Sequence, residues 1–400
     1  MNHSTEVLYP LLILLCAVWT TAIALRFLGI PTILGELLAG VILGPSMLNL
    51  FAPNEIINAL AEIGIFFLML HAGIKTDPKD FFKYFKKAFP IAVGGALVPL
   101  ILCFLLGILF GLTIKSALVI GLSMSATAIV VSLKIFKDLK LGKTKLIHII
   151  LGTSVFDAGF TLVLMTIVFS LFRNDFSAIS IFMILLRLAG FFVGIILFGN
   201  YIFPHFVHIF KSRNKKAFTF LIILALFFSL FAEQMGLSFM LGAFFAGVFF
   251  HEQIADKQNF QKIEDRVFSV AFSFLGPLFF VSLGFHFDFS VFYDFKDVTF
   301  LVALIFMATF SKIIGAGIMA RYFCKFSIYE STAIGIAMNG RAEIAFAVAL
   351  LALNNEFMSK EAFSALIGTI FFLNLITPLL LKWCILIIKK RGEFYRLKEA

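Results

Sequence analysis

One carboxylate, Asp157, lies near the middle of an apolar run at about 146–172. It is the only aspartate near the centre of a segment long enough to cross a membrane. A charge at that depth costs roughly 2.5 to 3.5 kcal/mol on insertion scales, so such a residue is commonly an ion or proton site. The alternative is an aspartate that hydrogen-bonds a neighbouring helix and stabilises the bundle. We take Asp157 as the candidate site.

Lys312 lies near the middle of another apolar segment, too far from either end for its ammonium group to reach the interface. It needs a buried partner, and Asp157 is the obvious candidate. Ser154, one helical turn before Asp157, is a further candidate ligand. Three glutamates lie near segment ends, where we expect water to reach them and their roles to be structural or gating: Glu36, Glu62 and Glu233.

Polar residues interrupt two more apolar segments. In GLSMSATAIVV (121–131) they are Ser123, Ser125 and Thr127, and in GIAMNGRAEIAF (335–346) they are Asn339, Gly340, Arg341 and Glu343. Both could be unwound helices whose freed carbonyls line a cavity, or the hydroxyls could bond back to their own helix. Arg341 and Glu343 lie two residues apart at midspan, and we expect them to pair.

Composition sets the class of protein. The 400 residues are 61% hydrophobic and 14% charged, and the mean hydropathy is +1.03. We predict an all-α membrane protein with about thirteen transmembrane helices. The predicted spans are 7–27, 30–49, 57–74, 88–112, 114–136, 145–172, 178–203, 217–234, 236–252, 268–285, 299–320, 330–353 and 362–388.

The basic residues indicate the orientation. Most of the 33 Lys and Arg fall in loops that share one side, together with the tail at 389–400. The positive-inside rule then predicts an external N-terminus and a cytoplasmic C-terminus, and explains the net charge of +10 without nucleic acid. No cleavable signal peptide is apparent. Four scattered cysteines suggest neither a disulfide framework nor a zinc site: Cys16, Cys103, Cys324 and Cys384.

Two segments recur along the chain. LGELLAGVIL (34–43) and LGAFFAGVFF (241–250) share five of ten positions at an offset of 207, and residues 63–73 resemble 275–284 at an offset near 212. Seven spans separate each pair, so the copies must have opposite orientations. Spans one to six and eight to thirteen therefore form an inverted repeat, an architecture that many secondary transporters share.

These motifs together resemble the monovalent cation:proton antiporter superfamily, in particular bacterial sodium/proton antiporters and the membrane domains of potassium efflux systems. The likeness covers essentially the whole chain. It rests on PTILGELLAGVILGPS (31–46), EIGIFFLMLHAGI (62–74), SATAIVVSL (125–133), the element at 153–159, LGAFFAGVFF (241–250), GPLFFVSLGF (276–285), SKIIGAGI (311–318) and GRAEIAF (340–346).

The resemblance implies six-helix inverted repeats with two crossed, broken helices at Ser125 and at Asn339–Gly340. The implied domains are a dimerisation panel (1–74 and 217–285), a transport core (88–172 and 299–388) and a linker helix (178–203). Asp157 would bind the transported Na+ or K+ or a proton, beside Thr127, Ser154 and Lys312, with Arg341 and Glu343 as a charge pair. The implied protein is a homodimer in the bacterial inner membrane, without cofactors.

Phe156 departs from the family pattern. Electrogenic members carry two adjacent acids here, and electroneutral ones carry Asn-Asp or Gln-Asp, whereas this chain has Phe-Asp. With a single acid we predict electroneutral exchange. The chain also ends at Ala400, soon after the last span, so we expect no appended nucleotide-binding domain.

Other functions fit less well. A sodium-coupled symporter of an organic anion on a similar inverted-repeat fold is the alternative, but it would need more polar residues at midspan. An intramembrane aspartyl protease needs two central aspartates that share a proton. A channel needs a filter of carbonyls or a ring of charges, and no such loop is apparent. We therefore expect a transporter and not an enzyme.

Overall fold

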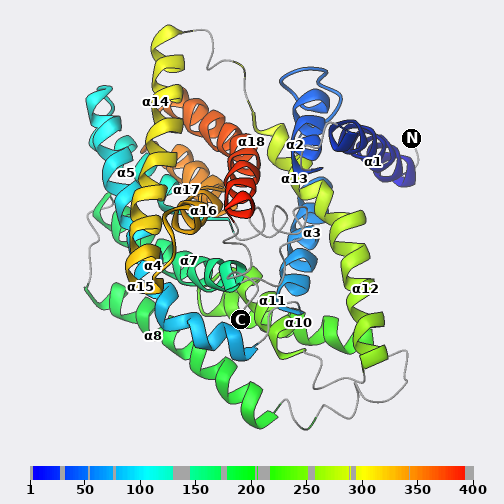
Figure 1. The fold of residues 1–400 in the computed structure, drawn as a ribbon. Helices are drawn as coiled ribbons and strands as arrows, with labels where there is room; N and C mark the ends of the chain where they lie inside the picture. Colours follow the sequence, from blue (N-terminus) through cyan, green and yellow to red (C-terminus); the bar gives the residue numbers. More distant parts are fainter. Residues whose placement is uncertain are drawn as a thin grey trace. The chain divides into compact units, whose positions relative to one another are not determined.

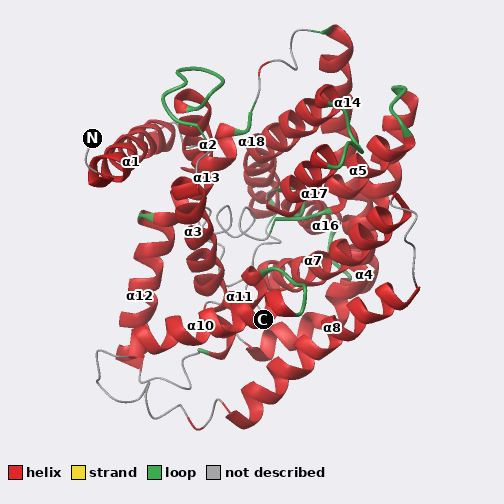
Figure 2. Ribbon diagram, turned by 180° about the vertical axis from the view of Figure 1, so that it is seen from behind, coloured by secondary structure: helices red, strands yellow, loops and turns green. Residues whose placement is uncertain are grey.

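A computed structural model describes residues 3–27, 32–52, 55–74, 78–128, 145–172, 178–202, 205, 217–250, 257–287, 289, 294–341 and 343–391. Every regular element of these residues is helical, and none is a strand (Figure 2). The all-α prediction is therefore confirmed for the described part of the chain.

The chain divides into two compact units. Unit 1 comprises Met1–Asn54, Tyr84–Asp175 and Phe280–Ala400, and unit 2 comprises Glu55–Lys83 and Phe176–Phe279. The helices of unit 1 are α1 (His3–Phe27), α2 (Thr32–Leu43), α4 (Pro78–Leu109), α5 (Ile114–Ser125), α7 (Lys145–Phe172), α14 (Phe295–Lys312), the π-helical turn η3 (Ile313–Gly317), α15 (Ile318–Cys324), α16 (Ile328–Ala337), α17 (Glu343–Asn354) and α18 (Lys360–Lys390). Those of unit 2 are α3 (Glu55–Ile74), α8 (Ala178–Leu197), η1 (Phe198–Ile202), α10 (Ala217–Gln234), α11 (Phe239–Phe249) and α12 (Lys257–Ser273). Two helices run across the boundary: α13 (Leu275–Phe285), and α4, whose first six residues belong to unit 2.

The membrane character is clear from helix length and hydropathy. Seven helical segments of the described residues are long and apolar enough to cross a bilayer, among them Lys86–Leu109, Phe295–Cys324 and Lys360–Lys390. Five shorter apolar helices accompany them. The multi-pass prediction is confirmed, whereas the count of thirteen spans and the division into panel and core stay predictions.

Glycines show the internal repeat as two equivalent helix contacts. In unit 1, α2 meets α13 so closely that a Cβ on Gly40 would lie 2.2 Å from the carbonyl oxygen of Val281 and 2.9 Å from Cα of Gly284. In unit 2, a Cβ on Gly247 of α11 would lie 2.3 Å from the carbonyl oxygen of Leu70 and 2.9 Å from Cα of Gly73. Gly40 and Gly247 are equivalent positions of the repeat, and small residues allow this close helix packing in membranes.

The two interrupted segments are also equivalent. Thr113 caps the start of α5 and Ser327 caps the start of α16, the latter in a capping box with Glu330. α5 ends at Ser125 and α16 ends at Ala337, 212 residues later, near the offset seen in the sequence. The predicted span 330–353 is thus broken before α17 begins at Glu343. The continuation of the span 114–136 beyond Ala128 lies outside the described residues.

Glu36 was expected near water, and this expectation was wrong. Its side chain is 3% exposed, and the same face of α2 one turn later, at Gly40, packs closely on the backbone of α13. Glu62 and Glu233 are exposed, as expected.

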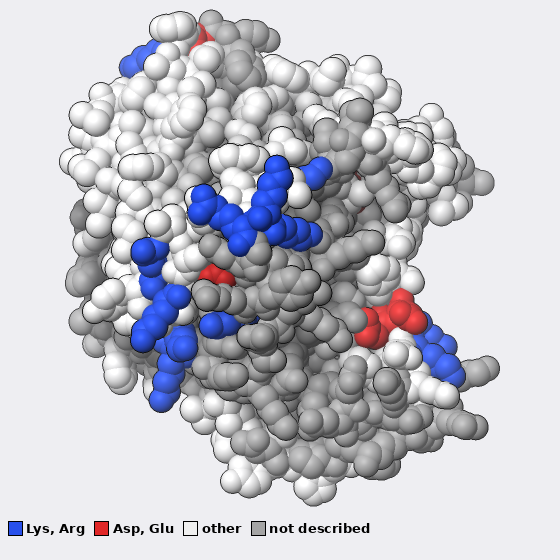
Figure 3. Space-filling model, in the orientation of Figure 1, with Lys and Arg blue, Asp and Glu red and all other residues white. Residues whose placement is uncertain are grey.

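Basic side chains gather at one end of unit 1. Lys145 lies 5.0 Å from the ring of Phe326, and Arg391 lies 4.3 Å from the ring of Tyr329, so the start of α7, the end of α18 and the α15–α16 connection meet there. Figure 3 shows such Lys and Arg side chains grouped on this face. The exposed basic residues at the ends of these helices and in the first third of α4 are Lys86, Lys87, Arg321, Lys325, Lys389, Lys390 and Arg391.

Candidate functional site

The two helix breaks meet inside unit 1. After α5 the backbone becomes extended at Ala126, and the amide of Ala128 donates to the carbonyl of Gly340 at 2.9 Å. The hydroxyl of Thr127 donates to the carbonyl of Met338 at 3.2 Å. α5 packs against α7 and α17, and α16 packs against α7 (Figure 1). The breaks thus expose backbone polar groups of both segments at one place, beside α7.

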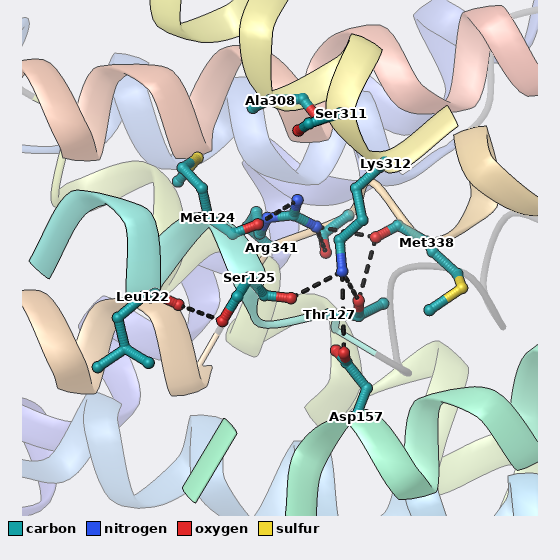
Figure 4. Close-up of polar contacts among 11 residues, drawn as sticks. Leu122, Met124, Ser125, Thr127, Asp157, Ala308, Ser311, Lys312, Met338 and Arg341 are labelled. Carbon is teal, nitrogen blue, oxygen red and sulfur yellow. Dashed lines mark hydrogen bonds and ion pairs between the residues drawn. The ribbon is translucent and has the colours of Figure 1, made fainter. Parts of the chain in front are cut away.

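Lys312 points into this crossing from the end of α14 (Figure 4). Its ammonium group donates to the carbonyl of Ser125 at 2.7 Å and to the hydroxyl of Thr127 at 2.8 Å. It forms an ion pair with Oδ1 of Asp157 at 3.8 Å, and both side chains are fully buried. The predicted pairing of Lys312 with Asp157 is therefore present, but the shortest contacts of Lys312 are with the last residue of α5 and with Thr127 in the break that follows it. The π-helical turn η3 follows at once, a feature often found at functional sites.

Asp157 has unused capacity to bind a ligand. Neither carboxylate oxygen accepts a hydrogen bond from the described residues, and the hydroxyl of Ser154 is likewise buried without a hydrogen-bond partner among them. Buried polar atoms are nearly always hydrogen-bonded to protein or water, so exceptions call for a reason. A carboxylate with free oxygens next to free hydroxyls can take up a proton or coordinate a cation.

Arg341 binds the ends of both broken helices. Its Nη1 donates to the carbonyls of Met338 at 2.8 Å and Gly340 at 3.2 Å, and its Nη2 donates to the carbonyl of Met124 at 2.8 Å. The last carbonyls of a helix lack intrahelical partners and carry the negative end of its dipole. Arg341 and Lys312 therefore supply positive charge and donors at the C-terminal ends of α5 and α16.

Asn374 of α18 was not predicted from the sequence. Its Oδ1 accepts from the amide of Arg341 at 3.0 Å, and its Nδ2 donates to the carbonyl of the same residue at 2.5 Å. The side chain is 1% exposed. It thereby fixes the peptide groups on either side of Cα of Arg341, within the break. An amide deep in a 31-residue apolar helix is a detectable signal by the same rule that identified Asp157.

The other predicted residues have varied positions. Ser125 ends α5, and its hydroxyl bonds back to Leu122. Asn339 lies in the second break, where it donates to the hydroxyl of Thr309 at 2.9 Å. Phe156 packs edge-on against Phe89 of α4 with ring centroids 5.3 Å apart.

Glu343 begins α17, but its side chain lies outside the described part, so its pairing with Arg341 stays a prediction. Among the described residues no group of three or more His, Cys, Asp or Glu could hold a metal ion.

Comparisons agree with this architecture. The family model for the transmembrane sodium/hydrogen exchanger matches residues 11–386. A relative from Enterococcus hirae named Na+/H+ antiporter is 30% identical over 93% of this chain and 96% of its own. A second, the Na+/H+-K+ antiporter GerN of Bacillus cereus, is 28% identical over 89% of this chain and 90% of its own. The solved structure of the sodium proton antiporter MjNhaP1 from Methanocaldococcus jannaschii superposes with a TM-score of 0.72 at 17% identity, covering 99% of each chain.

The helical fold and the crossing of two broken segments define a membrane transporter of the antiporter class. The chain belongs to the sodium/hydrogen exchanger family. This is a family of exchangers and not of enzymes, and the comparisons give no support to the symporter alternative.

Proposed function

We propose that this protein exchanges a monovalent cation, Na+ or K+, for protons across a membrane, and that Asp157 binds either ion in turn. The observation that carries the proposal is the fully buried carboxylate whose oxygens accept no hydrogen bond from the described residues and whose only ion pair there spans 3.8 Å. The names of the relatives, Na+/H+ antiporter and Na+/H+-K+ antiporter, support the same reaction.

Competition at one carboxylate couples the two fluxes. A protonated Asp157 has no negative charge to offset the dehydration of a cation, and a bound cation occupies the oxygens that would take the proton. Since one side chain cannot hold both ions, the site crosses the membrane with either a cation or a proton bound. At each side of the membrane one ion is released and the other is taken up. Alternating access of this kind is typical of transporters built from inverted repeats.

The contacts of Lys312 favour electroneutral exchange. Its ammonium group keeps two acceptors, the carbonyl of Ser125 and the hydroxyl of Thr127, when a cation takes the carboxylate. Lys312 can therefore stay protonated throughout the cycle. Asp157 then gives up one proton for each cation, and the net charge of the loaded site is the same in both forms.

The setting of the exchange is part of the proposal. We infer a homodimer in the bacterial inner membrane that works without a cofactor, with a scaffold panel and a transport core. The basic cluster in the first third of α4 and at the ends of α15 and α18 supports a cytoplasmic position for that end of unit 1, because cytoplasmic loops are rich in Lys and Arg. The C-terminus would then be cytoplasmic and the N-terminus external.

Proteoliposomes with an internal pH indicator test the exchange. A pulse of Na+, K+ or Li+ to vesicles of acidic interior should alkalinise the lumen if the purified protein is present. Empty vesicles and the same cations given with a protonophore are the controls. An absence of cation-dependent proton movement for all three cations would overturn the proposal.

An imposed membrane potential tests the charge balance. An electroneutral exchanger has the same initial rate at any potential, whereas a second proton carried by Lys312 would make the rate voltage-dependent. Phe156→Asp restores the second acid and should begin to respond to voltage. A clear voltage dependence of the unmodified protein would contradict one-for-one exchange.

A further inference from the structure

One face of α18 carries exposed apolar side chains and ends at a lysine. Leu379, Trp383 and Leu386 are 44%, 64% and 47% exposed, and Lys390, the last residue of the helix, is also exposed. At about 100° per residue these four positions fall within an arc of about 60°, and at about 1.5 Å per residue Lys390 lies about 10 Å beyond Trp383. The face is therefore apolar over about two turns and positively charged at its end.

α15 has the same pattern. Ile318 and Tyr322 are 57% and 77% exposed, and the exposed Arg321 lies on the same face, three residues after Ile318. Lys325 follows the helix in the left-handed conformation, with φ 55° and ψ 35°. This conformation favours glycine, so a lysine is strained there. The strained residue places an exposed charge where the apolar face ends.

Two aromatic rings bring the charged helix ends together. Cζ of Arg391 lies 4.3 Å from the ring centre of Tyr329, near the start of α16, and Nζ of Lys145 lies 5.0 Å from that of Phe326, just before it. Such cation–π contacts hold a cation in place over the ring. α16 also packs against both α15 and α18. The charged ends of the two apolar faces therefore meet at the start of α16.

The acidic side chain described at this place is directed into the protein. Glu330 is 6% exposed, and its Oε2 accepts from the amide of Ser327 at 2.7 Å within the capping box. The exposed charged side chains that the structure describes at this end of unit 1 are basic (Figure 3). The surface thus combines positive charge with exposed apolar faces that lead away from it.

We propose that this surface binds an anionic phospholipid, whose phosphate lies at Lys325, Lys390 and Arg391 and whose acyl chains cover the apolar faces of α15 and α18. Arginine and lysine are the residues that bind phosphate. A soluble anion would leave the apolar faces uncovered, and an uncharged lipid would bring no charge to the basic residues. An anionic membrane lipid meets both requirements. The inference depends neither on the exchange reaction nor on the side of the membrane.

The two tryptophans of the chain provide a direct test. Trp383 lies in the proposed site, and Trp19 lies on α1, where it is 67% exposed. A Trp19→Phe variant therefore reports the lipid beside α18, and a Trp383→Phe variant reports the lipid beside α1. Each full-length variant is reconstituted in mixed bilayers of phosphatidylglycerol and phosphatidylcholine, with bromine in the acyl chains of one lipid at a time. Since bromine quenches tryptophan fluorescence on contact, the two quenching curves give the preference of each site for the anionic lipid.

Trp383 should show a preference of about tenfold for phosphatidylglycerol, whereas Trp19 should stay within about twofold of no preference. In the Trp19→Phe background, Lys390→Gln and Arg391→Gln should each lower the preference about three- to fivefold. Lys360→Gln is the matched control, because Lys360 is exposed at the opposite end of the same helix, and it should change nothing. Choline chloride, which screens charge without supplying Na+ or K+, should weaken the preference.

Lys325→Gly separates lipid binding from folding. It removes the charge but relieves the strained backbone, because glycine favours the left-handed position after a helix. The preference should fall about three- to fivefold while Tm in detergent is unchanged or higher. A preference that does not fall in this variant would contradict the place assigned to the phosphate.

Equal quenching of Trp383 by the two lipids would overturn the inference, as would a preference that persists when Lys390→Gln and Arg391→Gln are combined. Displacement of phosphatidylglycerol by added inorganic phosphate would assign the surface to a soluble anion and overturn it as well. If neither lipid quenches Trp383 while both quench Trp19, protein covers this face of α18 and the inference fails.

Discussion

Asn374 holds the backbone of Arg341 at the helix break with two hydrogen bonds. Asn374→Ala would leave the buried amide and carbonyl of that residue without these bonds, at about 1–3 kcal/mol for each group. We expect a lower Tm in detergent, and slower exchange because the break is no longer fixed beside Lys312.

Thr377→Val is the control, since Thr377 lies one turn further along α18 and is fully buried, but its hydroxyl has no hydrogen-bond partner in the described residues. The Tm of the Thr377→Val variant should be unchanged or higher. Equal Tm values for Asn374→Ala and the unmodified protein would contradict the role assigned to Asn374.

The sequence identifies some single residues of the candidate site and not others. Asp157 and Lys312 are identifiable because a charge deep in an apolar segment is costly wherever its partner lies. The partners of Arg341 are main-chain carbonyls of two segments more than 200 residues apart, and carbonyls have no residue type to recognise. Asn374 gives a weaker signal, because an amide costs less in a membrane than a charge does.

Among the helices, Arg341 joins the C-terminal end of α5 to that of α16. Arg341→Met keeps the apolar stem but removes the donors to three carbonyls, two of them at helix ends that also lose a compensating charge. We expect a loss of about 3 kcal/mol or more. Thermal melts should place this variant well below Asp157→Asn, which removes only one long ion pair. Equal Tm values for these two variants would show that Arg341 does not hold the crossing together.

Glycine contacts between helices give a second prediction at the element scale. A Cβ on Gly247 would meet backbone atoms of α3 at 2.3 Å, so Gly247→Ala should force the helices apart at about 1–3 kcal/mol. Gly190 of α8 has no atom within 4 Å of such a Cβ, and Gly190→Ala should be neutral or stabilising because alanine favours helix. Thermal melts of the two variants should move apart, and a similar shift for both would contradict the close packing of α11 on α3.

The sequence predicts most helices and points to two positions where they break, but not to the contacts that hold the breaks. Length and hydropathy suffice for a long apolar segment such as α7, and the repeated glycines of α2 and α11 reveal equivalent contacts before any coordinates are known. The span 330–353 is apolar enough for one helix, and only its polar residues from Asn339 to Glu343 indicate an interruption. Its break at 338–341 is held by the side chain of Arg341 within the break and by Asn374 and the amide of Ala128, which come from elsewhere in the fold.

The orientation of the chain in the membrane is a property of the whole molecule. In a Cys16→Ser background the three remaining cysteines are buried, so an introduced cysteine can be labelled selectively. An impermeant maleimide added to intact cells should modify Lys296→Cys, at the start of α14, but modify Lys86→Cys only after the cells are opened. The reverse pattern would invert the topology and assign the basic cluster to the outside.

Proton release on cation binding tests the central claim, that one carboxylate holds either ion. Adding Na+ or K+ to purified protein in weakly buffered detergent solution should release about one proton for each cation bound, with the cation measured by equilibrium binding in the same sample. Asp157→Asn should remain folded, release no protons and lose cation binding. Cation binding without proton release, or release that persists in Asp157→Asn, would contradict the account.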